Sequence, residues 1–521
     1  MRLTQWSAVV TRSRVSRMLC RAAGAAGALV ISILSPAVSW AQAADGERAT
    51  LVRNVAVVDV RSGSVLRNQS ILLRGGRIAA VAPSAALDEP PGARHLEATG
   101  LYAIPGLWDM HVHTGFPDQY SRLYIANGVT GVRDMGGDAA VPDPVASTGF
   151  EQILDWRSRV EAGELPGPRI VAARSIIDGP PGFWPAVRVV AAEDEVRELV
   201  REELAAGADF LKVYDGLGAR EYRALADEAR RVGLEIHGHL PSAISLEDAA
   251  RAGQRTIEHL GLAGGRFLVM GSEGGARIAN RYRSALSADE EIREVMRRWL
   301  EVIGDAATSQ DPGRRRAVLE QLASSGIWQV PTWRTQRRMV LDPRLPPLES
   351  APLEYVPPLV RRAWSEHPAT VLAADPELGT LSEPVLRESA RLMQEMHAVG
   401  VRFLAGSDST NPGLVPGFAL HDELEDLVGE AGFTPLEALR MATLRPAEFL
   451  RRDEELGAVE TGMLADLVLL RGNPLESIER TREIEMVFAG GECFDRARLD
   501  GLLESVRRDF DRLGGSPAGA D

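Results

Sequence analysis

Cysteine is scarce in this sequence. Among its 521 residues only Cys20 and Cys493 are cysteines, and Cys20 lies in an N-terminal segment that we expect to be removed. The mature chain would then hold a single thiol, which excludes an intramolecular disulfide and argues against a metal held by sulfur. Histidine and carboxylate side chains must therefore supply the ligands of any metal site.

Positive charge is also in deficit. The formal net charge is −14, and the body of the chain has no cluster of basic residues that would form a nucleic-acid groove. We therefore expect no nucleic-acid partner. A small molecule or short peptide is the expected partner, and a homo-oligomer is compatible with the sequence.

A long apolar run is missing too, although residues 1–43 differ from the rest of the chain. They hold five arginines and no acid, then the stretch AAGAAGALVISIL, then the small residues AQA ending at Ala43. This order is typical of a secretory signal peptide. The apolar stretch is short and rich in glycine for a membrane span, so an uncleaved anchor is the weaker alternative. We expect cleavage near Ala43 and a periplasmic or secreted protein.

Short strands joined by turns are predicted at both ends of the remaining chain. Residues 44–102 include LVRNVAVVDV and SILLRGGRIAAVAP, and residues 451–498 include GMLADLVLLRGNPL and EIEMVFAGGECF. Such runs of β-branched residues broken by Gly and Ser favour strands. We predict one small β-sandwich built from both termini, followed by a C-terminal tail over 499–521.

The middle of the chain, residues 103–450, alternates strand-like and helix-like segments, which predicts an α/β fold with a parallel sheet and helical crossovers. Eight strands fit a closed (β/α)8 TIM barrel. Two long connections, near 261–327 and 334–401, are predicted to be helical insertions. The eight strands are expected at 103–110, 130–135, 169–176, 210–215, 235–240, 256–260, 328–333 and 402–408.

Polar residues stand where these predicted strands end. In LWDMHVHTG, His111 and His113 are two residues apart, so both imidazoles would leave one face of a strand. Taken alone the pair is as easily structural as functional. Barrel enzymes carry their chemistry at the C-terminal ends of the strands, and four further candidates stand at such ends: Lys212, His239, His259 and Asp408. Lys212 alone could be a snorkelling core lysine and Asp408 alone a helix cap, but their coincidence with the histidines favours a site.

In its motifs the chain resembles the amidohydrolase superfamily, and within it the imidazolonepropionase-like and Xaa-Pro-dipeptidase-like enzymes. The motifs are PGLWDMHVH, GVTGVRDMGG, GADFLKVYD, GHLP with AGQRTIEHL, AGSDS with FALHDELEDLV, LRPAEFL and GMLADLVLLRGNPL. They span nearly everything after the N-terminal segment. The resemblance implies a (β/α)8 barrel with a sandwich made from both termini, as predicted above.

The resemblance also implies two divalent metal ions. His111, His113 and Asp408 would bind the more buried ion and His239 and His259 the more exposed one. Lys212 would carry an N6-carboxyl group and bridge them, because a cationic ammonium cannot ligate a cation. The ions would share a hydroxide nucleophile, and Asp408 would act as general base and then general acid. Histidine and carboxylate ligands suit Zn²⁺ without excluding Mn²⁺ or Co²⁺.

The remaining assignments are more open. In HGH either His237 or His239 could ligate; we favour His239, which precedes the LP pair. Four residues are candidates for binding substrate: Tyr214, Arg133, His421 and His237. Arg133 could equally form a structural ion pair, and Trp333 could line the pocket or pack in the core.

The expected function is hydrolysis of amide or peptide-like C–N bonds, in dipeptides or N-acyl amino acids, by a secreted metal-dependent enzyme. Lactone or phosphotriester hydrolysis is the second hypothesis, since the same site would serve it. A non-catalytic binding protein is the third, and the complete set of six metal-site residues argues against it.

Overall fold

The structure is a computed structural model that describes residues 49–137, 148–182, 187–261, 265–275, 278 and 291–515. The chain divides into two units, Met1–Ala43 and Ala44–Asp521, and everything below concerns the second. The predicted signal peptide lies outside the described residues. No helix in the described ranges is both long and apolar enough to cross a membrane.

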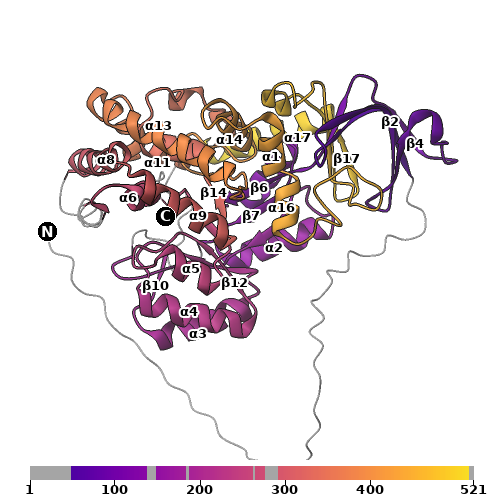
Figure 1. Cartoon of the computed structure of the whole chain (residues 1–521). Helices are drawn as coiled ribbons and strands as arrows, with labels where there is room; N and C mark the ends of the chain where they lie inside the picture. The colour runs from indigo at the N-terminus through magenta and orange to yellow at the C-terminus, as the bar shows by residue number, and fades with distance from the viewer. Residues whose placement is uncertain are drawn as a thin grey trace, which may run out of the picture. The chain divides into compact units, whose positions relative to one another are not determined.

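Strands from both ends of the chain form one sheet (Figure 1). Its order is β17-β16-β15-β5-β1-β2-β3, with β4 paired to β1. The N-terminal and C-terminal strands meet where β5 pairs antiparallel with β15, and β5 also pairs parallel with β1. The described residues place these strands in a single sheet, so the second layer of the expected sandwich stays a prediction. The strands are β1 (Thr50–Asp59), β2 (Ser64–Arg74), β3 (Arg77–Pro83), β4 (Arg94–Glu97), β5 (Tyr102–Pro105), β15 (Leu467–Leu470), β16 (Ile484–Ala489) and β17 (Glu492–Asp495).

The strand predicted over 103–110 is in fact two strands. β5 belongs to the sheet of the termini, and β6 (Leu107–Val112) starts the site-bearing part of the molecule. Gly106 separates them at a close approach, because a Cβ atom there would lie 2.0 Å from Oγ1 of Thr130. The prediction of one continuous strand was wrong, since a single glycine lets the chain pass from one sheet to the other.

Parallel strands alternate with helices through the middle of the chain. Pairing is parallel along β6-β7-β8, along β10-β9-β11-β12, and between β13 and β14. These strands are β7 (Val129–Asp134), β8 (Arg169–Ala172), β9 (Ile176–Asp178), β10 (Val187–Val189), β11 (Phe210–Val213), β12 (Glu235–Gly238), β13 (Thr256–Glu258) and β14 (Trp328–Val330). The first five intervening helices are α1 (Pro117–Ala126), α2 (Phe150–Glu161), α3 (Glu193–Ala206), α4 (Ala219–Val232) and α5 (Leu246–Ala252).

The predicted eighth strand, 402–408, forms isolated parallel bridges instead of a ladder. Phe403 pairs with Gln329 on β14, and Ser409, directly after the segment, pairs with Val112 at the end of β6. This segment therefore touches both the last and the first of the parallel strands. Among the described residues the pairings do not form one continuous ladder, so the α/β alternation is observed and the closed barrel stays a prediction.

The described parts of both long connections contain helices. α6 (Gly265–Gly271), α8 (Ile292–Thr308) and α9 (Pro312–Ser325) lie in the first, and α8 packs against α13 (Figure 1). The second holds α10 (Trp333–Met339), α11 (Pro358–Glu366), α12 (Pro368–Val371) and α13 (Pro376–Ala398), and α14 (Phe418–Gly429), α15 (Pro435–Met441) and α16 (Leu444–Phe449) follow.

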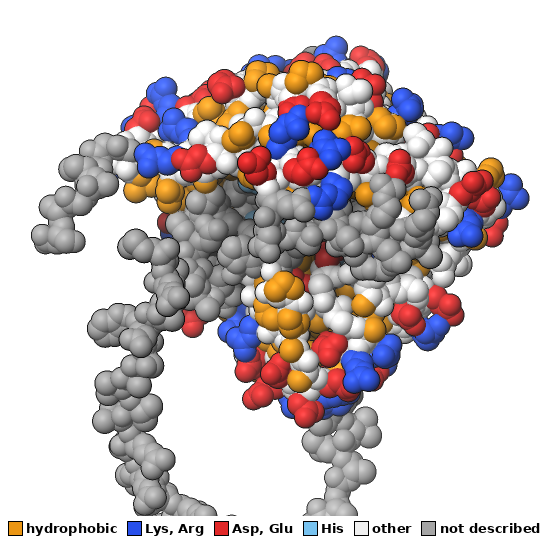
Figure 2. Space-filling model, turned by 90° about the vertical axis from the view of Figure 1, so that its left-hand side faces the viewer, with side chains coloured by type: hydrophobic (Ala, Val, Ile, Leu, Met, Phe, Trp, Pro, Cys, Tyr) orange, Lys and Arg blue, Asp and Glu red, His pale blue; other side chains and the backbone are white. Residues whose placement is uncertain are grey.

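The segment expected to be a C-terminal tail contains helix α17 (Arg496–Gly515). It packs against α1, where Arg122 pairs with Asp509 at 2.5 Å and the rings of Phe116 and Phe510 lie 5.6 Å apart. On the face drawn in Figure 2, basic and acidic side chains are interspersed over the surface.

Candidate metal centre

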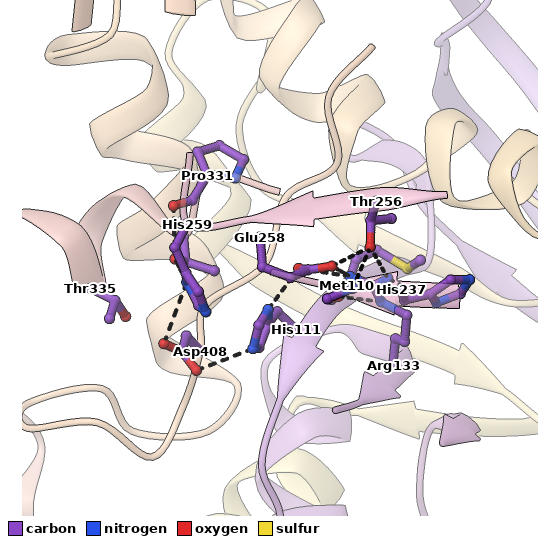
Figure 3. Close-up of polar contacts among 12 residues, drawn as sticks. Met110, His111, Arg133, His237, Thr256, Glu258, His259, Pro331, Thr335 and Asp408 are labelled. Carbon is purple, nitrogen blue, oxygen red and sulfur yellow. Dashed lines mark hydrogen bonds and ion pairs between the residues drawn. The ribbon is translucent and has the colours of Figure 1, made fainter. Parts of the chain in front are cut away.

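β6 ends at the centre of the site. His111 and His113 leave the same face of the chain, and both Nε2 atoms lie close to Oδ1 of Asp408, at 3.4 Å and 3.6 Å. These three residues form a buried group whose ligand atoms all lie within 4.8 Å of one another. Asp408 has a positive φ of 56°, a sparsely populated conformation that tends to occur at functional sites. Figure 3 shows Asp408 between His111 and His259.

Three of the imidazoles lie within 5 Å of a neighbouring ring. The ring centroids of His111 and His259 are 4.7 Å apart, and those of His239 and His259 are 4.8 Å apart. His113 adjoins His111 at 5.4 Å. Residues from β6 and from the ends of β12 and β13 thus meet in one cluster.

Each imidazole is anchored through its Nδ1 atom. Nδ1 of His111 lies 2.8 Å from the Glu258 carboxylate, and Nδ1 of His113 lies 2.8 Å from the Gly136 carbonyl oxygen. Asp215 and Thr332 hold Nδ1 of His239 and His259, at 2.6 Å and 2.7 Å. Carbonyl and carboxylate acceptors fix the proton on Nδ1 and leave the Nε2 lone pair for a metal, as the outer-shell partners of metal-binding histidines do.

Two of these Nε2 atoms, in His111 and His239, are buried and have no hydrogen-bond partner among the described residues. Buried polar nitrogens are nearly always paired, so these atoms indicate that a further group belongs between the rings. A neutral imidazole with a free lone pair suits a divalent cation. The residues present therefore fit the metal ions that the sequence implied.

Burial also keeps the imidazoles of His111, His113 and His259 neutral. Together with the charge of Lys212, it lowers the pKa of His113 to about 4, and it lowers the pKa of His111 and His259 well below the usual value. Neutral rings are the form that ligates a metal.

Lys212 lies on β11, is 1% exposed, and is the only lysine in the chain. Its Cδ atom would lie 3.1 Å from a Cβ atom placed on Gly238, so the glycine beside His239 makes room for the lysine stem. Burial lowers the pKa of Lys212 and raises that of Asp408. Every other basic side chain is arginine, so Lys212 is the one side-chain amine that the chain provides.

Arg133 and His237 lie beneath the cluster, enclosed by the core. Nη2 of Arg133 donates to both Glu258 oxygens at 3.0 Å, and its Nε donates to the Met110 carbonyl oxygen at 2.6 Å. His237 receives Nη1 of Arg133 at 3.2 Å on Nδ1 and stacks on Phe210. Both side chains are almost completely buried. Their polar atoms face one another inside the core, so the structure gives a role for both side chains in the core, and substrate binding by them stays an untested prediction. It is His239 that stands beside His259.

His421 likewise lies inside the core. It lies on α14, is fully buried, and uses both ring nitrogens, toward Oγ1 of Thr481 at 2.9 Å and the carbonyl oxygen of Asn127 at 3.0 Å. It joins the helix to the chain segments around it, and its assignment to substrate stays an untested prediction. Tyr214 lies in the site: its ring is 4.1 Å from that of His239 and the residue is partly exposed. Its role in substrate binding stays a prediction, and Trp333 is buried at the start of α10.

Glu258 and Asp109 are the important residues that the sequence analysis missed. Glu258 holds Nδ1 of His111. Asp109 accepts hydrogen bonds from the backbone N–H and the hydroxyl of Ser407, at 2.8 Å and 2.6 Å, and these bonds connect β6 to the segment that carries Asp408. The available signal was a carboxylate inside an otherwise apolar strand, in LWDMH and in TIEHL. Such a residue is buried only with a partner.

The family model for the amidohydrolase family matches residues 102–275 and 365–493. The chain belongs to this family. It is 23% identical to ochratoxinase from Aspergillus niger over 503 residues, which cover 86% of this chain and 87% of the relative. Among solved structures it resembles a bottromycin amidohydrolase, with a TM-score of 0.68 and 24% identity over 89% of this chain and 91% of the other. A Xaa-Pro dipeptidase solved with methionine in its active site has a TM-score of 0.58 and 19% identity, over 86% of this chain and all of the other.

These comparisons agree with the resemblance read from the motifs. The fold is a TIM-barrel-like α/β fold, and the chain is a hydrolase that acts on C–N bonds.

Proposed function

We propose that this amidohydrolase is exported from the cytoplasm and cleaves the amide bond of dipeptides or N-acyl amino acids with two divalent ions. The observation that carries the proposal is the set of four imidazoles anchored at Nδ1, in which two buried Nε2 atoms, of His111 and His239, have no hydrogen-bond partner among the described residues. A closed (β/α)8 barrel and a two-layered β-sandwich are parts of the same proposal.

The donors divide into two groups. His111, His113 and Asp408 would hold one ion, and His239 and His259 the other, with Zn²⁺ favoured by the donor set. Lys212 would bridge them as a carbamate, since its amine is buried among the same residues and would otherwise repel the cations. Divalent ions held in this way supply an acidified water and a Lewis acid for the scissile carbonyl.

Asp408 would move the proton. Its two oxygens face different imidazoles, Oδ1 toward His111 and His113 and Oδ2 toward His259 at 3.9 Å from Nδ1. Asp408 would take the proton of the attacking water and deliver it to the leaving nitrogen. Tyr214, beside His239, would contact the substrate.

The names of the relatives support the substrate class. The relatives named ochratoxinase, bottromycin amidohydrolase and Xaa-Pro dipeptidase are hydrolases. Their names favour an amide as the substrate of this chain. At 18–24% identity the likeness of the solved structures shows the fold alone, so the choice of dipeptides and N-acyl amino acids is our proposal.

The test is a screen of the Zn²⁺-loaded protein against dipeptides, N-acyl amino acids, lactones and a phosphotriester. We expect turnover of the amides, at a rate that chelation abolishes and Zn²⁺ restores. His111→Ala should lose metal and activity while keeping its secondary structure, and His95→Ala, which removes an exposed imidazole from β4, should behave as wild type. Turnover confined to lactones or phosphotriesters would contradict the substrate class, and full activity in His111→Ala would contradict the metal site.

A further inference from the structure

A cavity whose lining includes none of the proposed metal ligands lies between α10, α14 and the segment 346–352. Its volume is about 350 Å³, within the range of small-molecule pockets. Three arginines and two acids supply the charges in its wall: Arg334, Arg338, Arg482, Asp422 and Glu425. The rest of the lining includes Pro346, Pro347, Pro352, Leu414 and Phe418.

The acids in this wall already have partners. Asp422 pairs with Arg482 at 2.5 Å, and Glu425 pairs with the same guanidinium at 2.5 Å. Arg334 pairs with Asp426 at 2.8 Å, behind the cavity wall, and lies 3.8 Å from Asp422.

Arg338 is the exception. Its side chain is only 8% exposed, yet no carboxylate of the described residues lies within 4.0 Å of it, and its Nε has no hydrogen-bond partner there. Its one hydrogen bond runs from Nη2 to the Pro346 carbonyl oxygen at 3.4 Å. A buried guanidinium is normally paired, so Arg338 is a buried cation in the cavity wall with no carboxylate of the described residues within ion-pair distance.

Gly413 keeps the space beside this guanidinium open. Its φ is +80°, and a Cβ atom there would lie 3.0 Å from Nη2 of Arg338. The glycine and Arg338 therefore form the polar end of a cavity whose other walls are largely proline, leucine and phenylalanine. One fork of donors at the end of an apolar pocket matches a carboxylate attached to an apolar body, because guanidinium and carboxylate pair through two parallel hydrogen bonds.

We propose that this cavity binds a small organic acid, with its carboxylate on Arg338 and its apolar part against the prolines and Phe418. The site does not depend on the proposed hydrolysis, since the residues that line it are separate from the proposed metal ligands. It is nevertheless linked to them through the chain, because Arg338 lies six residues after Thr332, which holds His259, and Gly413 lies five residues after Asp408.

Phenylacetate is a suitable probe, and phenylacetamide is its neutral match. Calorimetric titration of the metal-loaded full chain should show saturable binding of phenylacetate and at least tenfold weaker binding of phenylacetamide. Arg338→Gln should weaken phenylacetate binding by about tenfold to a hundredfold, the scale of losing hydrogen bonds to a charged group. Arg230→Gln, which removes an exposed arginine on α4, should leave the affinity unchanged.

Two more variants test whether the acid binds at the metal centre instead and whether Arg338 only supports the fold. His239→Ala should bind phenylacetate as wild type does; loss of binding there would show that the acid sits on the metal and would overturn the proposal. Arg338→Met should bind no phenylacetate and unfold at a temperature no lower than wild type, because it removes an unpaired buried charge. A clear fall in that unfolding temperature would show that the guanidinium has a structural role. The site would also be refuted by any of three binding results: equal binding of phenylacetate and phenylacetamide, binding of inorganic phosphate in preference to phenylacetate, or no saturable binding.

Discussion

Glu258 offers the most direct test of how the cluster is held in place. Its carboxylate accepts two hydrogen bonds from Nη2 of Arg133 and holds Nδ1 of His111, and both it and Arg133 are completely buried. Although burial opposes ionisation, the charges of Arg133 and Lys212 keep the pKa of Glu258 below its usual value. Glu258→Gln keeps the shape of the side chain and removes the charge.

Two losses of different size are expected. Breaking one side of a buried ion pair leaves the Arg133 guanidinium uncompensated, which costs about 3–5 kcal/mol in the free energy of unfolding. Loss of an outer-shell partner of a metal-binding histidine costs about tenfold to a hundredfold in metal affinity. Glu247→Gln, which removes an exposed acid paired with Arg251 on α5, should cost less than about 1 kcal/mol and leave metal affinity unchanged.

The double variant Glu258→Gln with Arg133→Met separates the two effects. Removing the stranded guanidinium should recover most of the lost stability in the metal-free protein, whereas His111 would still lack its carboxylate, so metal affinity should stay low. Urea unfolding measures the first quantity and competition with a chelator the second. Wild-type metal affinity in Glu258→Gln, or recovery of affinity together with stability in the double variant, would refute the idea that Glu258 orients His111.

Three other predictions concern Lys212, His421 and the N-terminal segment. Lys212→Ala should bind about one metal ion fewer per chain and lose at least roughly a hundredfold in kcat, and acetate or propionate should restore part of the activity. Because the chain has no other lysine, wild-type protein in ¹³C-bicarbonate should give one side-chain carbamate signal by NMR. Absence of this signal in active two-metal protein would exclude the bridge. Burial, with the charge of Arg482, lowers the pKa of His421 to about 3. Below about pH 6.5 the unfolded chain therefore binds a proton at His421, whereas the folded chain stays neutral there down to about pH 3. Over this range the free energy of unfolding falls with falling pH, by up to about 1.4 kcal/mol per pH unit. Metal-free His421→Gln should lack this share of the acid sensitivity in urea unfolding, and an unchanged pH slope would contradict the assignment. N-terminal sequencing of protein from its native host should find a chain that starts near Ala44, and recovery of Met1 in the cytosol would contradict export.

Strand ends were predictable because periodicity and turn residues locate them, and a polar residue at such an end has few structural uses. His111, His113 and Asp408 were found in this way, and the structure brings them together. Depth along a strand was harder to predict. His237 shares a face with His239, but two residues at about 3.3 Å each place it roughly 6–7 Å deeper, where it meets Arg133 instead of solvent.

Partners from other segments were beyond the sequence altogether. No residue near His421 in the sequence predicts its partners. Its two ring nitrogens form hydrogen bonds with Oγ1 of Thr481 and with the carbonyl oxygen of Asn127. The position of Glu258 within a short apolar strand indicated a buried carboxylate. Its role, however, depends on Arg133, which is 125 residues away along the chain. Such contacts follow from the tertiary arrangement, which no local pattern specifies.

The pairing of β5 with β15 has a consequence for the order in which the protein can be assembled. Tyr102–Pro105 forms β5, directly before the histidine-bearing strand, and its partner Leu467–Leu470 lies more than 300 residues later and leaves the ribosome long after it. Contacts this distant in sequence form slowly, because a long loop must close first. Until then β5 exposes an unpaired edge that invites association with other chains. A chain truncated before residue 467 should consequently aggregate rather than fold into a smaller working enzyme.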